Sequence, residues 1–147
     1  MLNRRNFIRT TVTGAVGITL VNESFANFLS QKNKKKLGIA LVGLGYYSTD
    51  LLAPALEMTE YCYLAGIVTG SPTKAEQWKQ KYKLVDKNIY NYENFDSIAN
   101  NPDIDVVYIV LPPSMHMEYS IRAANAGKHV WCEKPMAMTV SECQNMI

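Results

Sequence analysis

An apolar run that ends in a glycine-rich turn constrains the fold of this chain more than any other feature. Residues 37–42 are continuously apolar, which is typical of a strand buried on both faces of a parallel sheet. Gly43, Leu44 and Gly45 follow directly, and residues 49–58 have a helical pattern in which a proline is expected to bend or delay the helix. The segment therefore predicts the first strand, turn and helix of an α/β fold.

The same alternation of strand and helix continues along the chain. Further strands are predicted at residues 62–68, 89–90, 105–111 and 129–132, and further helices at 72–82, 95–99, 114–126 and from 139 onward. Ser71 and Ser114 are candidate helix caps, Gly127 is a helix end, and Thr139 begins a capping box. This order predicts a doubly wound parallel sheet, a Rossmann fold, over residues 37–147, with its last strand absent.

The N-terminus has the regions of an export signal. It reads Asn3-Arg4-Arg5-Asn6-Phe7-Ile8-Arg9, followed by a mildly apolar stretch at 10–21 and by Ser24-Phe25-Ala26, a site that a signal peptidase could cut. The apolar stretch is too short to span a bilayer as an ordinary helix. The arrangement resembles the bacterial twin-arginine signal, which implies export in the folded state. We therefore expect a signal peptide at 1–26, a linker at 27–36, a periplasmic location and no membrane contact after cleavage.

Charge and cysteine content exclude several classes of function. The signal segment holds three of the 15 basic and one of the 13 acidic residues, which leaves 12 of each. A neutral domain gives no reason to propose nucleic acid or an anionic membrane as a partner. Cys62, Cys132 and Cys143 lack metal-ligand spacing, so we predict neither a metal site nor a disulfide framework. Cys62 and Cys132 lie in apolar strands and are expected to be buried and inert.

The glycine turn has the spacing of a dinucleotide-binding turn. Gly43 permits a tight turn, Gly45 lets the backbone approach a pyrophosphate, and Ser48 is small enough for the place where a third glycine often packs helix on strand. The helix N-terminus would present amide groups to the phosphates. The alternative is a glycine-rich turn without a ligand. The residues predicted here to bind the cofactor are Gly43, Leu44, Gly45, Tyr46 and Tyr47.

The end of the second strand indicates which nicotinamide cofactor is bound. An NAD site usually has a carboxylate here to bind the ribose hydroxyls, but residues 68–74 contain none. Instead Thr69, Gly70, Ser71 and Lys74 combine hydroxyl groups, a helix start and a positive charge, which together suit an anion. The segment therefore favours NADP over NAD. The alternative is that Lys74 is only a solvated residue in the first turn of its helix.

Two later segments leave strands at the same edge of the predicted sheet. Pro112 and Pro113 end one strand, where the backbone could line the nicotinamide side of a pocket, and His116 could face that pocket or be a surface residue. Glu133 and Lys134 follow the last strand. Glu133 could accept a hydrogen bond from ribose, and Lys134, with its pKa lowered by burial, could hold a substrate hydroxyl and assist its proton loss. The alternative for this pair is an ion pair on a loop.

These motifs together resemble one oxidoreductase family. The glycine turn, the Pro112 to His116 turn and the triplet Glu133-Lys134-Pro135 are similar to the Gfo/Idh/MocA family, from about residue 36 to 147. The resemblance implies that Glu133 contacts the cofactor ribose and that Lys134 contacts the hydroxyl that is oxidised. It further implies hydride transfer between the nicotinamide and a sugar or polyol. The signal and residues 69–74 look most similar to exported members that hold NADP tightly.

The resemblance also implies a second domain. Family members carry a C-terminal α+β domain that supplies an oligomer sheet and further catalytic residues, so we expect the full-length protein to be a homo-oligomer. That domain is absent from this sequence, and Lys134 has no acid/base partner here. Two alternatives to the sugar oxidoreductase therefore stay open. One is a non-catalytic NAD(P)-binding module, and the other is a nicotinamide-dependent glycoside hydrolase of the same family.

Overall fold

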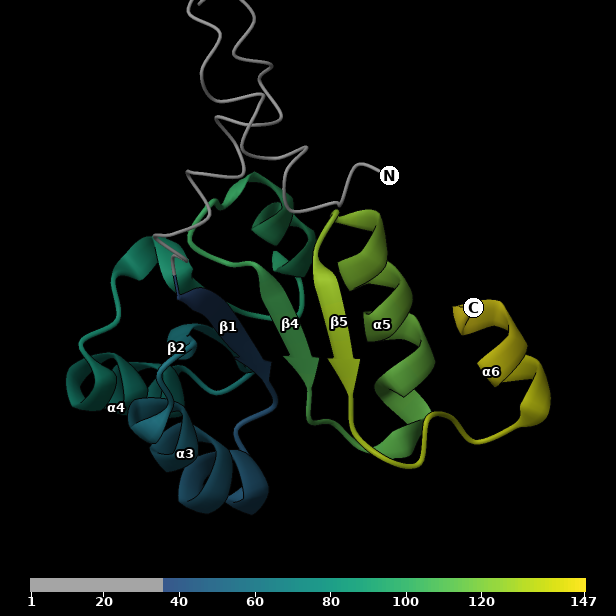
Figure 1. Ribbon diagram of the computed structural model, residues 1–147, viewed down its shortest axis with the longest axis horizontal. Coiled ribbons are helices and arrows are strands. Elements are labelled where there is room, and N and C mark those ends of the chain that lie inside the picture. The colour runs from purple at the N-terminus through teal and green to yellow at the C-terminus, as the bar shows by residue number, and fades with distance from the viewer. Residues whose placement is uncertain (1–35) are drawn as a thin grey trace, which may run out of the picture. The chain divides into compact units, whose positions relative to one another are not determined.

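Five parallel strands form the sheet in the part of the chain that the structure describes, residues 36–147 of a computed structural model (Figure 1). Their order is β3-β2-β1-β4-β5, which is the order of a doubly wound sheet with the first strand at its centre. The strands are β1 (Leu37–Val42), β2 (Cys62–Val68), β3 (Ile89–Tyr90), β4 (Val106–Ile109) and β5 (His129–Cys132). The predicted fold class is confirmed. The predicted signal peptide, and the linker before residue 36, lie outside the described residues.

Helical segments connect the strands. The elements are η1 (Tyr47–Leu52), α3 (Ala53–Met58), α4 (Pro72–Tyr82), η2 (Asp86–Asn88), η3 (Phe95–Asn100), η4 (Pro113–Met115), α5 (His116–Asn125) and α6 (Val140–Met146). Ser71 caps α4 by accepting a hydrogen bond from the Lys74 N–H, and Thr139 forms the expected capping box with Glu142. Gly127, at a φ of 71°, follows α5 as predicted.

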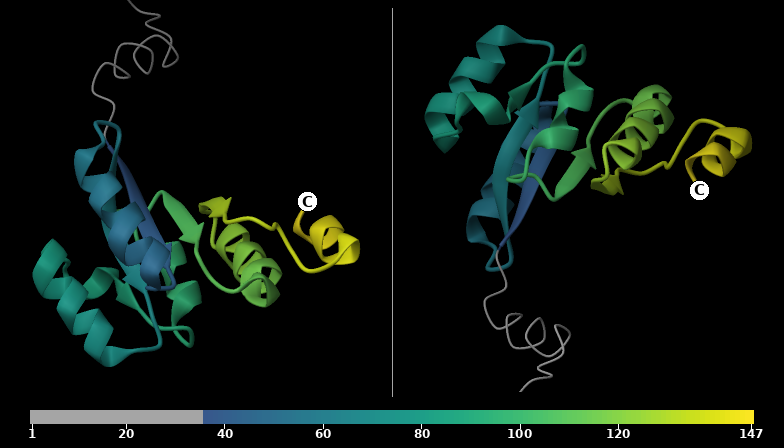
Figure 2. Two further views of the ribbon diagram at one scale, coloured as in Figure 1. Left: turned by 90° about the horizontal axis from the view of Figure 1, so that it is seen from below. Right: turned by 90° about the horizontal axis from the view of Figure 1, so that it is seen from above.

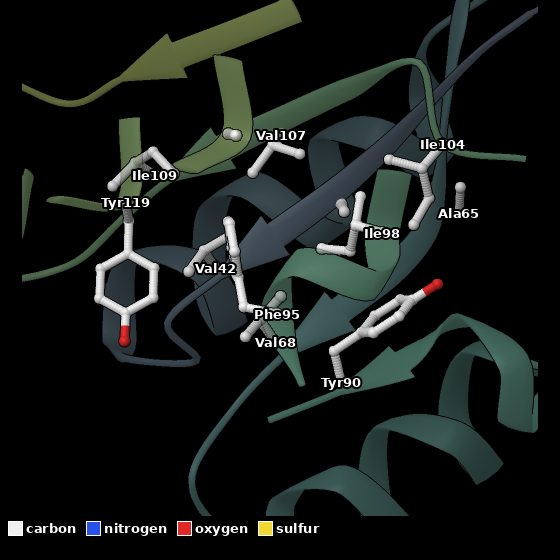
Figure 3. Packing of buried hydrophobic residues seen from close by; sticks show 12 residues of the cluster. Val42, Ala65, Val68, Tyr90, Phe95, Ile98, Ile104, Val107, Ile109 and Tyr119 are labelled. Carbon is white, nitrogen blue, oxygen red and sulfur yellow. The ribbon is translucent and has the colours of Figure 1, made fainter. Parts of the chain in front are cut away.

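Helices cover both faces of the sheet (Figure 2). On one face, Ala53 of α3 and Trp78 of α4 pack against apolar side chains of β1, β2 and β4. On the other, Phe95 of η3 and Tyr119 of α5 pack against a second set, and several of its members are labelled in Figure 3. Every residue of β1 after Leu37 is buried, as its continuous apolar run predicts.

Several local predictions need correction. The helix expected from residue 49 begins two residues earlier as the π-helical turn η1, and regular α-helix starts only next to Pro54, which has no N–H to donate. Strand β4 is shorter than the predicted 105–111. Ser114 is not a cap, because Pro113 begins a tighter 3-10 turn that already contains it. Cys62 and Cys132 are half-buried rather than buried.

Strand register determines what meets at the carboxyl edge of the sheet. Val42 of β1 pairs with Val68 of β2 and with Ile109 of β4, and Ile109 in turn pairs with Cys132 of β5. The segments that follow these four strand ends therefore emerge side by side, and the arrowheads of β1, β4 and β5 point to the same edge in Figure 1. Within residues 36–147, no helix has the length and apolar character needed to cross a membrane.

Candidate functional site

A cavity of about 520 Å³ lies at this edge of the sheet. Its volume is within the range of small-molecule and cofactor sites. Three segments far apart in the sequence contribute to it: the glycine turn, the end of β4 and the loop after β5. The residues that line it are Gly45, Tyr46, Tyr47, Val110, Leu111, Glu133 and Lys134. Five of the predicted site residues are thus brought together, whereas Val110 and Leu111 were not predicted.

The two glycines of the turn differ in what requires them. Gly43 has a φ of 93°, and a Cβ on it would lie 2.5 Å from the carbonyl oxygen of Val110. The fold itself therefore demands glycine at this position. A Cβ on Gly45 would have no neighbour within 4 Å. Since the protein leaves that space open, Gly45 is suited to close approach by a ligand, as the pyrophosphate prediction requires.

Buried contacts hold the turn against the start of η1. Ser48 is fully buried, and its hydroxyl donates to the Gly43 carbonyl oxygen at 2.5 Å. It thus occupies the place of the third glycine with its one polar group satisfied. Leu44 is buried in the core, whereas Tyr46 is 72% exposed and Tyr47 is 39% exposed at the cavity. No side chain caps the first turn of η1, in which the Thr49 N–H donates to the Gly45 carbonyl oxygen at 3.0 Å.

Lys74 is joined to the glycine turn. Its ammonium group donates to the carbonyl oxygen of Leu44 at 2.9 Å, although 30 residues separate the two. The Thr69 hydroxyl accepts from the Ser71 N–H at 3.2 Å, which tightens the same corner. Thr69 and Gly70 line a second pocket of about 260 Å³ at the ends of β2 and β3. Lys74 is therefore attached to the glycine turn, whereas Thr69 and Gly70 line this second pocket.

Glu133 has hydrogen bonds to both oxygens of its carboxylate. Oε1 accepts from the hydroxyl of Tyr108, a residue that the sequence did not single out, and Oε2 accepts from the Lys134 N–H at 3.3 Å. The Glu133 N–H donates to the Ile109 carbonyl oxygen at 3.1 Å, which attaches the loop to β4. The Lys134 side chain is exposed, so the burial expected for it is not present among the described residues.

Tyr108 lies behind the cavity wall. Burial raises the pKa of its hydroxyl well above the usual value, and the hydrogen bond to the Glu133 carboxylate, its negative charge and the nearby Tyr47 hydroxyl raise it further. The phenol is therefore a hydrogen-bond donor at any physiological pH. The only sequence signal for it was a polar group within the apolar residues of β4, and such groups are hydrogen-bonded when buried.

His116 is buried rather than on the surface, at 1% exposure. Its Nδ1 lies 2.8 Å from the Pro135 carbonyl oxygen and its Nε2 lies 2.7 Å from that of Leu111. The imidazole thus joins the loop after β5 to the end of β4, and neither ring nitrogen faces the cavity. Pro112 and Pro113 lead from Leu111 into α5 and are also absent from the cavity lining. The prediction that these three residues contact a cofactor stays untested.

The described residues contain no group of three or more His, Cys, Asp or Glu side chains arranged to hold a metal ion. The three cysteines of this part of the chain are unpaired. Burial raises the pKa of the Cys132 thiol, which keeps it protonated at neutral pH.

Comparison with known proteins shows the family and the fold. Residues 37–147 match the Gfo/Idh/MocA family, described as an oxidoreductase family with an NAD-binding Rossmann fold. D-xylose 1-dehydrogenase (NADP(+)) of Haloarcula marismortui is 32% identical over 108 residues, which are 74% of this chain and 30% of that protein. Inositol 2-dehydrogenase of Salmonella typhimurium is 32% identical over 114 residues, which are 76% of this chain and 32% of that protein.

A solved structure extends the comparison. Aldose-aldose oxidoreductase from Caulobacter crescentus, complexed with glycerol, superimposes with a TM-score of 0.75 and 46% identity, over 76% of this chain and 33% of that one. The chain thus spans about a third of the length of these relatives. Together with the five-stranded sheet, these matches show that the chain belongs to the Gfo/Idh/MocA oxidoreductase family through its NAD(P)-binding Rossmann domain.

Proposed function

We propose that this chain is the nucleotide-binding part of an exported oxidoreductase that transfers a hydride between NADP(H) and a sugar or polyol. The observation that carries the proposal is that the glycine turn and the pair Glu133 and Lys134 line one cavity. A site that combines an open glycine backbone with a carboxylate and an ammonium group can hold both a dinucleotide and the hydroxyl compound it oxidises. The names of the xylose, inositol and aldose enzymes among the relatives support this substrate class.

Each residue of the cavity has a distinct task in this proposal. The Gly45 backbone and the first turn of η1 receive the pyrophosphate, because their amide groups are uncapped by side chains. Glu133 accepts hydrogen bonds from ribose hydroxyls. Lys134, exposed at the cavity, donates a hydrogen bond to the substrate oxygen and stabilises the negative charge that develops there, while the hydroxyl proton would pass to solvent water, which reaches this exposed position. When bound, the nicotinamide supplies the hydride acceptor or donor.

The preference for NADP over NAD rests on the corner at the end of β2. This corner offers no carboxylate, and it holds the Lys74 ammonium group 2.9 Å from the glycine turn. A 2′-phosphate at this corner would gain a positive charge and the hydroxyls of Thr69 and Ser71. The NADP-dependent xylose relative supports the assignment.

Calorimetric titration of the purified chain with NADP+ and NAD+ tests the cofactor proposal. We expect NADP+ to bind at least tenfold more tightly, and Lys74→Met to bring the two affinities close together, since a lost charge-assisted contact of about 1.4 kcal/mol is a factor of ten. Lys81→Met, in the last turn of the same helix, is the matched control and should keep the preference. Tighter binding of NAD+ by the unaltered chain would overturn the NADP assignment.

Export is tested separately. Residues 1–36 fused to a reporter that folds in the cytoplasm should carry it to the periplasm, and replacing Arg4 and Arg5 with lysine should retain it inside. A cofactor that leaves the cell with its protein cannot be exchanged against a cytoplasmic pool, so we also expect NADP to copurify with the exported protein. Transport that survives the double replacement would contradict the twin-arginine proposal.

A further inference from the structure

The hydroxyl of Tyr108 lies against the Glu133 carboxylate. Tyr108 is in β4, paired with Leu41 of β1 and Trp131 of β5, and its ring does not line the cavity. Its hydroxyl donates to Oε1 of Glu133. A ligand in the cavity would therefore meet a carboxylate that Tyr108 already holds.

The neighbours of Tyr108 fix the tyrosine itself. Its ring packs edge to face against Trp131, with centroids 5.7 Å apart and planes at 83°. The strand positions on both sides are hydrogen-bonded in the sheet. The Tyr47 hydroxyl, at the cavity, also lies close enough to influence Tyr108. A donor held this rigidly restricts the rotation of any carboxylate it binds.

The Glu133 side chain has little freedom left. Its backbone N–H is bonded to Ile109, and its Oε2 accepts from the following Lys134 N–H. With Tyr108 on Oε1, both oxygens have one donor from the protein, and each retains acceptor capacity for a further hydrogen bond. Of these three contacts, the one with Tyr108 is made by a side chain, whereas the other two are made by backbone groups.

We infer that Tyr108 is a positioning residue: by holding Oε1 of Glu133, it fixes the direction in which this carboxylate meets the ribose next to the nicotinamide. The inference rests on the proposed function, in which Glu133 accepts hydrogen bonds from ribose hydroxyls of the cofactor. On this inference, Tyr108 is necessary only for binding the nicotinamide half of the cofactor. The adenosine half, bound at the end of β2, does not depend on it.

Two ligands, NADP+ and adenosine 2′,5′-bisphosphate, distinguish binding of the nicotinamide half from binding of the adenosine half. Tyr108→Phe should weaken NADP+ binding about five- to tenfold in calorimetric titration, and should leave the affinity for adenosine 2′,5′-bisphosphate unchanged, because that fragment lacks the nicotinamide ribose. Tyr63→Phe is the matched control. Tyr63 is a half-buried tyrosine near the opposite end of β2, and its hydroxyl also makes one hydrogen bond, at 3.3 Å to the Asp103 carbonyl oxygen. It should bind both ligands as the unaltered chain does.

A double-substitution cycle keeps the test independent of folding defects. In a Glu133→Ala background, Tyr108→Phe should no longer change NADP+ affinity, since the group it positions is gone. Equal weakening of both ligands, an unchanged NADP+ affinity, or an undiminished effect in the Glu133→Ala background would overturn the positioning role. Failure of the unaltered chain to bind NADP+ would instead overturn the proposed function, and this inference with it.

Discussion

Replacing Gly43 and Gly45 separately with alanine separates the folding role of the glycine turn from its binding role. The two residues are two positions apart and receive the same methyl group. At Gly43 the methyl would lie 2.5 Å from the Val110 carbonyl oxygen and 2.9 Å from a Leu111 methyl, on a backbone with a φ of 93°. At Gly45 it would have no neighbour within 4 Å. The substitution should therefore have opposite consequences at the two sites.

The magnitudes follow from these contacts. An L-residue at such a φ costs about 1–3 kcal/mol, and overpacking against backbone costs about 1–3 kcal/mol more. Gly43→Ala should therefore remove about 2–6 kcal/mol of the free energy of unfolding, a large part of the roughly 5–15 kcal/mol that a domain has. Gly45→Ala should change it by less than about 1 kcal/mol. Its methyl instead occupies space that the cofactor needs, so NADP+ affinity should fall about tenfold or more.

Urea unfolding followed by tryptophan fluorescence measures the first quantity. Trp78 is 5% exposed in the core between α4 and the sheet, so its emission reports the loss of this packing. Calorimetric titration with NADP+ measures the second. The reasoning is refuted if Gly45→Ala destabilises the chain as much as Gly43→Ala, because the open space at Gly45 would then be wrong. If Gly45→Ala binds NADP+ normally, the cofactor does not need the open space at Gly45.

Three further predictions use the same assays. Asn101→Ala should cost about 1–3 kcal/mol in urea unfolding, because its amide donates at 2.7 Å to both Asn88 and the Tyr90 hydroxyl in a buried cluster; an unchanged midpoint would contradict this. The folded pKa of Tyr108 lies above the unfolded value of about 10, so the stabilisation that its hydroxyl gives the folded state is present below pH 10 and is lost as the pH rises above 10. Tyr108→Phe should therefore flatten the fall in Tm at alkaline pH, and an equally steep fall would count against this prediction. His116→Phe should remove the imidazole that lies between the Pro135 and Leu111 carbonyl oxygens, lower the Tm and speed amide exchange after β5, whereas unchanged exchange there would exclude a bridging role.

The strands and the site edge were predictable because they depend on local patterns. A continuous apolar run, a glycine turn and a Ser-Pro helix start each impose structure through their own residues. In a parallel sheet the strand ends then converge on one edge, whatever the exact register. This is why Gly45, Tyr47, Glu133 and Lys134 could be assigned to one cavity before the structure was known. Some predictions that failed, such as Ser114 as a cap, concern single helix ends, where a neighbouring proline changed which turn forms. Others, such as the burial of Cys62, Cys132 and Lys134, depend on what the rest of the fold places over a side chain.

The structural roles of Tyr108 and His116 could not be predicted from the sequence, for a different reason. The role of each depends on which atom lies opposite it across the fold, and no local pattern encodes that. In sequence Tyr108 is one aromatic residue in an apolar strand, and only the register of β4 with β5 places its hydroxyl under Glu133, 25 residues later. His116 was assigned by its position after a double proline, which suits a cavity-lining role equally well. In the structure its ring nitrogens lie against the carbonyl oxygens of Leu111 and of Pro135, which is 19 residues away, so the imidazole joins two loops.

The same distinction explains how the edge can be both open and ordered. Residues that face the cavity, such as Gly45 and Lys134, make few contacts with the protein and leave room for ligand. The residues that fix the cavity loops lie one layer behind: Ser48 under the glycine turn, Tyr108 under Glu133 and His116 between the two loops. Each satisfies a polar group that would otherwise be free to rotate or to be solvated. Substitutions in this second layer should therefore alter cofactor binding without touching the cofactor, and their effect should depend on the cavity residue that each one supports.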